Sequence, residues 1–171
     1  MQTRMIRWAL PFALVAAIGA GTAIAASAAS HTSGGTVKTA KSAKYGAVLV
    51  AANGMTLYRY TPDSKGVSTC SGACSKFWPP LLASAGAKPT AGTGASSSLL
   101  GTIKRGKGAQ VTYAGFPLYF YAGDKKAGDV AGQGVEGTWY VVSAKGALVK
   151  HAVAATAATT ASTTKKSTAW G

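Results

Sequence analysis

Short apolar runs separated by turn residues predict β-strands through the middle of the chain. The run 47–52 leads through Asn53-Gly54 into the run 55–60. An Asn-Gly pair between two apolar runs is a strong β-hairpin signal, because both turn residues of the common form take a positive φ. We therefore expect a hairpin at the start of this region.

The same pattern returns later in the chain, around Ala114-Gly115. The further predicted strands are 99–104, 110–113, 116–121, 139–143 and, after a turn at Gly146, 147–150. No amphipathic helix of useful length is predicted between 45 and 150. The expected fold class is all-β, with roughly seven or eight short strands in a small sandwich or partly closed barrel.

An internal duplication underlies this pattern. Residues 57–63 recur as residues 118–124, and the same offset of 61 pairs Trp78 with Trp139. Aromatic residues make up only 9% of the chain, so an ungapped alignment at this offset that matches four tyrosines and two tryptophans indicates two related repeats. The repeats are predicted at about 45–82 and 106–145, joined by an Ala/Ser/Gly/Thr-rich linker at 83–98.

The N-terminus has the layout of a secretory signal peptide. Arg4 and Arg7 precede an uncharged apolar run at 8–20, and two Ala-x-Ala cleavage sites follow by residue 28. The alternative is an uncleaved anchor, since 8–29 is long enough to cross a bilayer. The signal peptide predicts a secreted or extracytoplasmic protein associated with the cell envelope. Since no cysteine lies near the cleavage region, we expect that the protein is not lipidated.

Charge is scarce and one-sided in this chain of 171 residues: 18 Lys and Arg stand against 4 Asp and Glu, a net charge of +14. The stretches 29–44 and 151–171 are lysine-bearing and poor in large apolar side chains, so they are predicted to be disordered. The predicted order is a signal peptide at 1–28, a disordered basic linker at 29–44, a two-repeat β domain at 45–150 and a disordered tail at 151–171.

The lysine-bearing tails have two interpretations. They could be held near anionic envelope polymers or lipid head groups by salt-sensitive attraction, or they could be spacers whose charge aids solubility. Nucleic acid is not an expected partner, because basic and aromatic residues do not interleave as in a nucleic-acid-binding module.

The repeated signature Tyr-x-Tyr-x-x-Asp, at 58–63 and again at 119–124, resembles that of the secreted-repeat family of predicted bacterial lipoproteins. The Cys70 to Cys74 segment before Trp78 and the Gly132-Gln-Gly134 segment before Trp139 are also similar to that family. The resemblance implies a location outside the cytoplasm and paired repeats. It implies no established biochemical activity.

Eight residues of the repeats form the candidate cluster for ligand binding or for the repeat core. Tyrosines two apart in a strand share a face, and an Asp just past the strand end favours a turn or accepts a tyrosine hydroxyl. One interpretation is a cluster that stabilises the repeats; the other is an aromatic platform for a glycan or another flat ligand. The eight are Tyr58, Tyr60, Asp63, Trp78, Tyr119, Tyr121, Asp124 and Trp139.

Cys70 and Cys74 are the two cysteines of the chain. In an oxidising compartment a close pair is most simply one disulfide, which stabilises by roughly 2 kcal/mol. The alternative is a copper or thiol-exchange site, which would want a neighbouring histidine. His31 and His151 lie at or near the tails, so no third ligand is evident.

Catalysis has little support in the sequence. Four acids and two peripheral histidines form no recognisable nucleophile–base pair, and Asp63 or Asp124 would be the residues of any hydrolase site. We therefore expect no enzymatic activity and no cofactor. The leading hypothesis is a secreted β-module with a binding or structural role; the alternative is an extracytoplasmic redox or metal-handling protein that uses Cys70 and Cys74.

Overall fold

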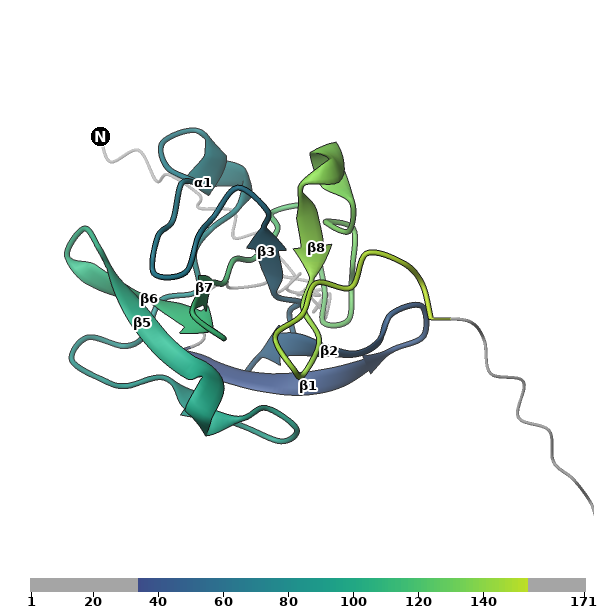
Figure 1. Cartoon of the computed structure of the whole chain (residues 1–171), viewed down its shortest axis with the longest axis horizontal. Helices are drawn as coiled ribbons and strands as arrows, with labels where there is room; N and C mark the ends of the chain where they lie inside the picture. Colours follow the sequence, from purple (N-terminus) through teal and green to yellow (C-terminus); the bar gives the residue numbers. More distant parts are fainter. Residues whose placement is uncertain (1–33, 154–171) are drawn as a thin grey trace, which may run out of the picture.

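The computed structural model describes residues 34–153 (Figure 1). It confirms an all-β fold built from two related repeats. The sheets are three, with strand orders β2-β1-β4, β3-β8 and β5-β6-β7, and no sheet of the described chain closes into a barrel. The strands are β1 (Thr36–Ser42), β2 (Gly46–Ala51), β3 (Tyr58–Tyr60), β4 (Thr90–Ala91), β5 (Leu100–Arg105), β6 (Gly108–Tyr113), β7 (Phe116–Pro117) and β8 (Trp139–Val141). The helical turns are α1 (Cys74–Phe77), η1 (Ser97–Leu99) and η2 (Val135–Gly137).

Each repeat begins with an antiparallel hairpin, β1–β2 in the first and β5–β6 in the second (Figure 1). Val37 pairs with Ala51 in one hairpin, and Leu100 pairs with Tyr113 at the corresponding place in the other. The central strands β2 and β6 are buried along most of their length, whereas the outer strand β5 alternates between half-buried and exposed residues from Gly101 to Arg105. This alternation is expected of strands with one face on the core.

The turn after the central strand differs between the repeats. In the first repeat Gly54 has φ 82° and donates its N–H to the Ala51 carbonyl, and this bond closes a three-residue loop. Asn53 does not take a positive φ in this loop. In the second, both Ala114 (φ 51°) and Gly115 (φ 85°) are left-handed, as a two-residue loop requires. Both predicted hairpins are confirmed, but the expected positive φ at Asn53 is wrong.

The two repeats exchange their last strands. β8, which ends the second repeat, pairs with β3 of the first, and Leu49 of β2 donates its N–H to Val142 at 2.7 Å. In the reciprocal arrangement Val111 of β6 donates to Leu81 at 2.8 Å. Each half is therefore completed by an extended segment from the other half, and the repeats form one domain.

A pseudo-two-fold axis relates the halves and passes between Tyr58 and Tyr119. Each of these tyrosines donates its backbone N–H to the carbonyl of the other, at 2.8 and 3.0 Å. Further from the axis, Thr61 donates to Thr138 at 2.9 Å, and the bond that corresponds by symmetry is from Ala122 to Phe77 at 2.8 Å. The repeats therefore share one backbone path.

Proline breaks the symmetry at one place. Trp78-Pro79-Pro80 occupies the position that β8 has in the second repeat, but it forms one isolated bridge, from Pro80 to Tyr119, instead of a strand. Proline has no N–H to donate to a ladder, so the segment can only accept there. Phe120 donates its N–H to the Pro79 carbonyl at 2.8 Å, which keeps the segment in place.

The predicted disorder at 29–44 is wrong where the structure describes it, because β1 lies within that stretch. The side chain of Val37 is fully buried and pairs across to β2, so one large apolar residue and a continuous ladder are enough to order a lysine-bearing segment. The first repeat therefore starts before residue 45. Residues 29–33, and the signal peptide predicted at 1–28, lie outside the described residues.

The linker predicted at 83–98 also has structure. β4 pairs in parallel with β1, and η1 begins at Ser97. At the other end, Val153 donates its N–H to the Lys44 carbonyl at 2.8 Å, while residues 154–171 of the predicted tail lie outside the described residues. Within residues 34–153, no helix has both the length and the apolar character to cross a membrane.

Strand exchange leads to a prediction about the separated halves, 34–98 and 99–153. Each half alone lacks the strand that completes its sheet, so we expect neither to fold as a monomer. An equimolar mixture should recover the dispersed amide NMR spectrum of the intact domain. A folded monomer of either half, identified by NMR together with analytical ultracentrifugation, would contradict the exchanged topology.

Candidate functional site

The eight residues of the predicted cluster gather around the pseudo-two-fold axis. Tyr58 of the first repeat donates its hydroxyl hydrogen to Asp124 of the second at 2.8 Å. Tyr119 of the second repeat donates to Asp63 of the first at 2.6 Å. These crossed bonds tie each signature to the other repeat.

Both carboxylates are buried and accept further hydrogen bonds. The second oxygen of Asp63 accepts from the backbone N–H and the hydroxyl of Thr69, at 2.7 and 2.8 Å. That of Asp124 accepts from the N–H of Ala131 at 2.9 Å. Each aspartate therefore fixes the loop that follows it in its own repeat, as well as a tyrosine of the other repeat.

Burial raises the pKa of Tyr58 and of Tyr119 above the ordinary value of 10.0, and the aspartate that each tyrosine contacts raises it further. A negative phenolate would be poorly solvated there and would lie next to a carboxylate. Both phenols therefore remain protonated and act as donors well above neutral pH.

The other four aromatic residues form one continuous stack, in the order Tyr60, Trp139, Trp78, Tyr121. The two indoles are 3.8 Å apart at 3°. Tyr60 of the first repeat lies 4.3 Å from Trp139 of the second, and Tyr121 of the second lies 4.4 Å from Trp78 of the first. The stack is therefore crossed between the repeats in the same way as the Tyr–Asp bonds.

This packing decides what the tryptophans can offer to a ligand. Each indole has another ring on both of its faces, and 4% of Trp78 and 1% of Trp139 is exposed. Neither face is open for a sugar or another flat molecule to stack on. The platform geometry that the sequence suggested is therefore excluded for the tryptophans, which present only their edges.

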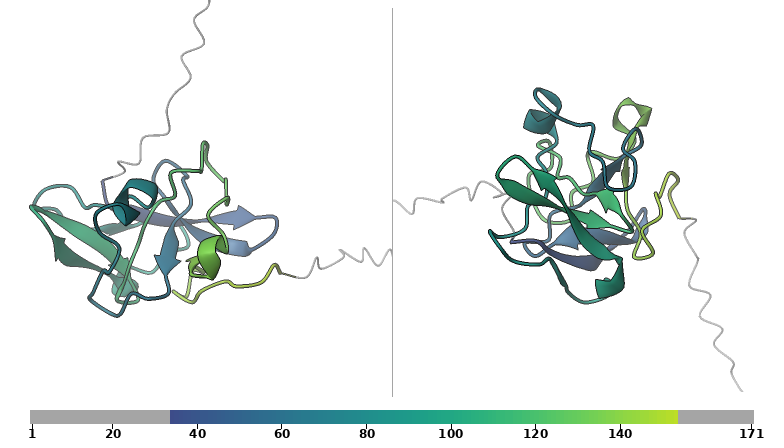
Figure 2. Two further views of the ribbon diagram at one scale, coloured as in Figure 1. Left: turned by 90° about the horizontal axis from the view of Figure 1, so that it is seen from above. Right: turned by 60° about the vertical axis from the view of Figure 1, so that its left-hand side comes forward.

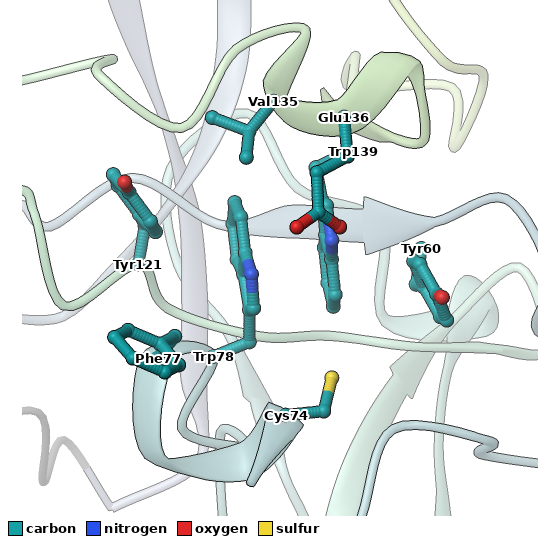
Figure 3. A pocket seen from close by; sticks show the side chains of 8 residues that line it. All are labelled: Tyr60, Cys74, Phe77, Trp78, Tyr121, Val135, Glu136 and Trp139. Atoms are coloured by element: carbon teal, nitrogen blue, oxygen red, sulfur yellow. The ribbon is translucent and has the colours of Figure 1, made fainter.

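Those edges form the floor of a cleft of about 320 Å³ between α1 and η2 (Figure 3). The two helical turns occupy equivalent positions in the repeats and lie on the same side of the molecule (Figure 2). The cleft is lined by Tyr60, Cys74, Phe77, Trp78, Tyr121, Val135, Glu136 and Trp139.

The indole N–H groups of Trp78 and Trp139 have no hydrogen-bond partner among the described residues. Within that part of the chain, the fully buried side-chain nitrogen and oxygen atoms without a hydrogen-bond partner are Arg59 Nε and Thr138 Oγ1. The two indole nitrogens are not among these atoms, so solvent reaches both of them. In Figure 3 the rings are seen edge-on, with the nitrogens on the visible edge. The floor therefore presents two donors side by side.

One wall of the cleft contains the Cys70–Cys74 disulfide, which confirms the predicted pairing. Cys70 is buried, whereas Cys74 at the start of α1 is half-exposed and faces the cleft. Arg105 of β5 holds this loop by donating to the Cys70 carbonyl and to the Ser68 hydroxyl. Ser68 in turn lies 2.7 Å from the Tyr119 hydroxyl, which links the loop to the Tyr–Asp pair.

The second repeat has Ala131 and Val135 where the first has its cysteines. There Gln133 replaces the disulfide: its amide nitrogen donates to Val149 at 2.7 Å, and its oxygen accepts from Val141 at 2.8 Å. Gly132 is required in this loop, because a Cβ would lie 2.9 Å from the rings of Tyr58 and Trp78.

Sequence reasoning missed Phe77, Val135 and Glu136 in the cleft walls. Phe77 is 63% exposed, and Glu136 is exposed with φ 52°, a left-handed conformation that is uncommon for a non-glycine residue. Such strain tends to occur at functional sites. The offset of 61 could have located Val135, since it is the counterpart of Cys74.

No group of three or more His, Cys, Asp or Glu side chains within residues 34–153 could hold a metal ion. Asp63 and Asp124 each accept hydrogen bonds from a tyrosine hydroxyl and from a backbone N–H group, and these bonds do not pair the two carboxylates with each other.

A family described as a secreted repeat of unknown function matches residues 39–82 and 101–143, about half of the chain. The chain belongs to this secreted-repeat family. The two matched segments begin within β1 and β5, so the family boundaries agree with the hairpins at the start of each half. The family description supports an extracellular location. No curated protein and no solved structure matches the chain.

The raised pKa values predict alkaline sensitivity of this secreted-repeat protein. Above pH 10 the unfolded chain releases the protons of Tyr58 and Tyr119 while the folded chain keeps them. Their stabilising contribution is complete below pH 10 and is lost as pH rises beyond it, by up to about 1.4 kcal/mol per pH unit for each tyrosine. Urea unfolding at a series of pH values measures this slope.

The control is the double variant Tyr58→Phe, Tyr119→Phe, which has no phenol at either position. It should be less stable at neutral pH but show a shallower decline above pH 10. An equal slope in the variant and in the wild-type protein would contradict the assignment.

Proposed function

We propose that this protein is a non-enzymatic binding module at the outside of the cell, and that the cleft on the pseudo-two-fold axis is its binding site. The observation that supports the proposal is the pair of unpartnered indole N–H groups in the floor of the cleft. Nearly all of each tryptophan is buried, yet its one polar group is directed to the opening. Concave, mostly apolar pockets with a few convergent polar groups are typical of small-molecule sites.

The rest of the cluster supports binding rather than catalysis. Asp63 and Asp124 are committed to tyrosines and loop N–H groups. Glu136 is the single carboxylate of the cleft lining, so the lining contains no pair of carboxylates for acid–base chemistry. A rigid floor with short, shaped walls fits recognition of a ligand without turnover.

A redox role is the second candidate, because Cys74 faces the same cleft. In that role a partner thiol would enter the cleft and exchange with the disulfide. Mass spectrometry of the native protein separates the two proposals: a two-hydrogen mass deficit that survives mild reductant supports a structural disulfide. Free thiols or co-purified copper would favour the redox or metal-handling role.

Filling the cleft tests the binding proposal. Val135→Trp places a large side chain in the cleft wall without removing an internal hydrogen bond of the tyrosine–aspartate pairs. We expect the affinity for cell-envelope preparations of the source cells, measured by co-sedimentation, to fall by about tenfold or more, the equivalent of about 1.4 kcal/mol.

The matched control is Val153→Trp, which makes the same substitution at an exposed residue outside the cleft. It should sediment like the wild-type protein. Loss of binding in all three proteins on addition of salt would assign the attraction to the positive charge of the chain instead. Equal binding by the Val135→Trp variant, or none by the wild-type protein, would overturn the proposal.

A further inference from the structure

The cleft contains enough chemistry to indicate the class of ligand, an inference that rests on the proposed function. Trp78 and Trp139 each contribute one N–H donor, and the stack holds the two rings parallel at 3.8 Å. Since neither donor has a partner in the described chain and both are open to solvent, a ligand that displaces water from the floor must supply acceptors at two neighbouring points. One compact group of atoms can supply acceptors at two neighbouring points.

Ionic ligands fit the cleft poorly. The edge of an aromatic ring is its electropositive part, so a cation directed at the floor would meet two ring edges and two N–H donors of the wrong polarity. A carboxylate or phosphate would satisfy the donors, but it would share the cleft with the carboxylate of Glu136. The ligand group that contacts the floor is therefore neutral.

A neutral ligand must also use Glu136, whose carboxylate only accepts hydrogen bonds. The ligand therefore accepts at the floor and donates at the rim. Hydroxyl groups do both, because each has one donor hydrogen and two acceptor lone pairs. Peptide amides also donate and accept, but successive carbonyls of an extended peptide point to opposite sides, whereas neighbouring sugar hydroxyls lie side by side.

We propose that the cleft binds a neutral glycan through two adjacent hydroxyl groups. The hydroxyl oxygens accept from the N–H groups of Trp78 and Trp139, and a further hydroxyl donates to Glu136. Phe77 of α1 and Val135 of η2 contact the C–H surface of the sugar from the two walls (Figure 3). Glu136, whose φ is left-handed, contributes its side chain to this lining.

The indole N–H signals of the full chain report directly on this contact. Proton–nitrogen NMR of the protein resolves them, with Trp8 and Trp170, which lie outside the described residues, as internal controls. The probes are neutral disaccharides (maltose, cellobiose and N,N′-diacetylchitobiose), their per-O-methylated forms, an acidic uronic-acid disaccharide and a neutral dipeptide amide. We expect the signals of Trp78 and Trp139, and not those of the two controls, to shift with at least one unmodified neutral sugar and not with its methylated form.

A variant with 3-benzothienylalanine in place of Trp139 gives the sharpest test, because sulfur replaces the N–H while the stacked ring is kept. Loss of one hydrogen bond should weaken sugar binding by between about threefold and about tenfold. Glu136→Gln, which removes the charge, should relax discrimination against the uronic acid. Equal affinity in both variants and in the wild-type protein would overturn the glycan assignment.

The outcomes separate this inference from the proposed function. If the uronic acid or the dipeptide shifts both indole signals and no neutral sugar does, the cleft is a binding site but not for a neutral glycan. If no probe shifts these signals and the Val135→Trp variant binds envelope preparations normally, the glycan assignment and the binding function both fail.

Discussion

The crossed hydrogen bonds between tyrosine and aspartate are the interaction on which the rest of the structure depends. Tyr58 and Tyr119 meet at the axis through their backbones, and their hydroxyls reach the aspartates of the opposite repeats. A hydrogen bond to a buried charged group contributes about 1.5–3 kcal/mol, and leaving such a carboxylate without its donor costs more. The same two aspartates also anchor, through Thr69 and Ala131, the loops that lead to α1 and η2.

The crossed arrangement also explains why a cleft forms at the axis. Strand exchange brings Trp78 and Trp139 face to face, and each indole then packs against a tyrosine of the other repeat. Because the faces of the rings are used for packing, the polar edges turn outward between the two helical turns. Stability and recognition therefore use different parts of the same side chains. The repeats differ mainly in how their loops are held, by Cys70–Cys74 in the first and by Gln133 in the second.

Much of the candidate site could be predicted from the sequence, because the offset of 61 pairs its residues two by two. The duplication predicts that Tyr58 and Tyr119 have equivalent environments, and the structure agrees. It does not predict which Tyr binds which Asp, since bonds within a repeat and bonds between repeats give the same sequence pattern. The crossing depends on where the last strand of each repeat pairs, a long-range choice that local pattern does not contain.

The fold was predictable in class but not at its edges. β1 was missed because Thr36–Ser42 contains one large apolar residue and two lysines, a composition typical of a disordered segment. The duplication predicts a strand there, as the equivalent of β5, but local composition outweighed it. β4 was missed because a two-residue parallel pairing leaves no periodicity. The first turn, at Gly54, has one residue more than the turn at Gly115, so the offset of 61 does not align the strands before these turns. This hides the similarity of the first hairpins of the two repeats.

A pair of double-mutant cycles tests the crossed pairing most directly. The first combines Tyr58→Phe with Asp124→Asn, and the second combines Tyr58→Phe with Asp63→Asn; urea unfolding gives the coupling free energy of each. We expect a coupling of about 1 kcal/mol or more in the first cycle and close to zero in the second. Coupling between Tyr58 and Asp63, with none between Tyr58 and Asp124, would contradict the account.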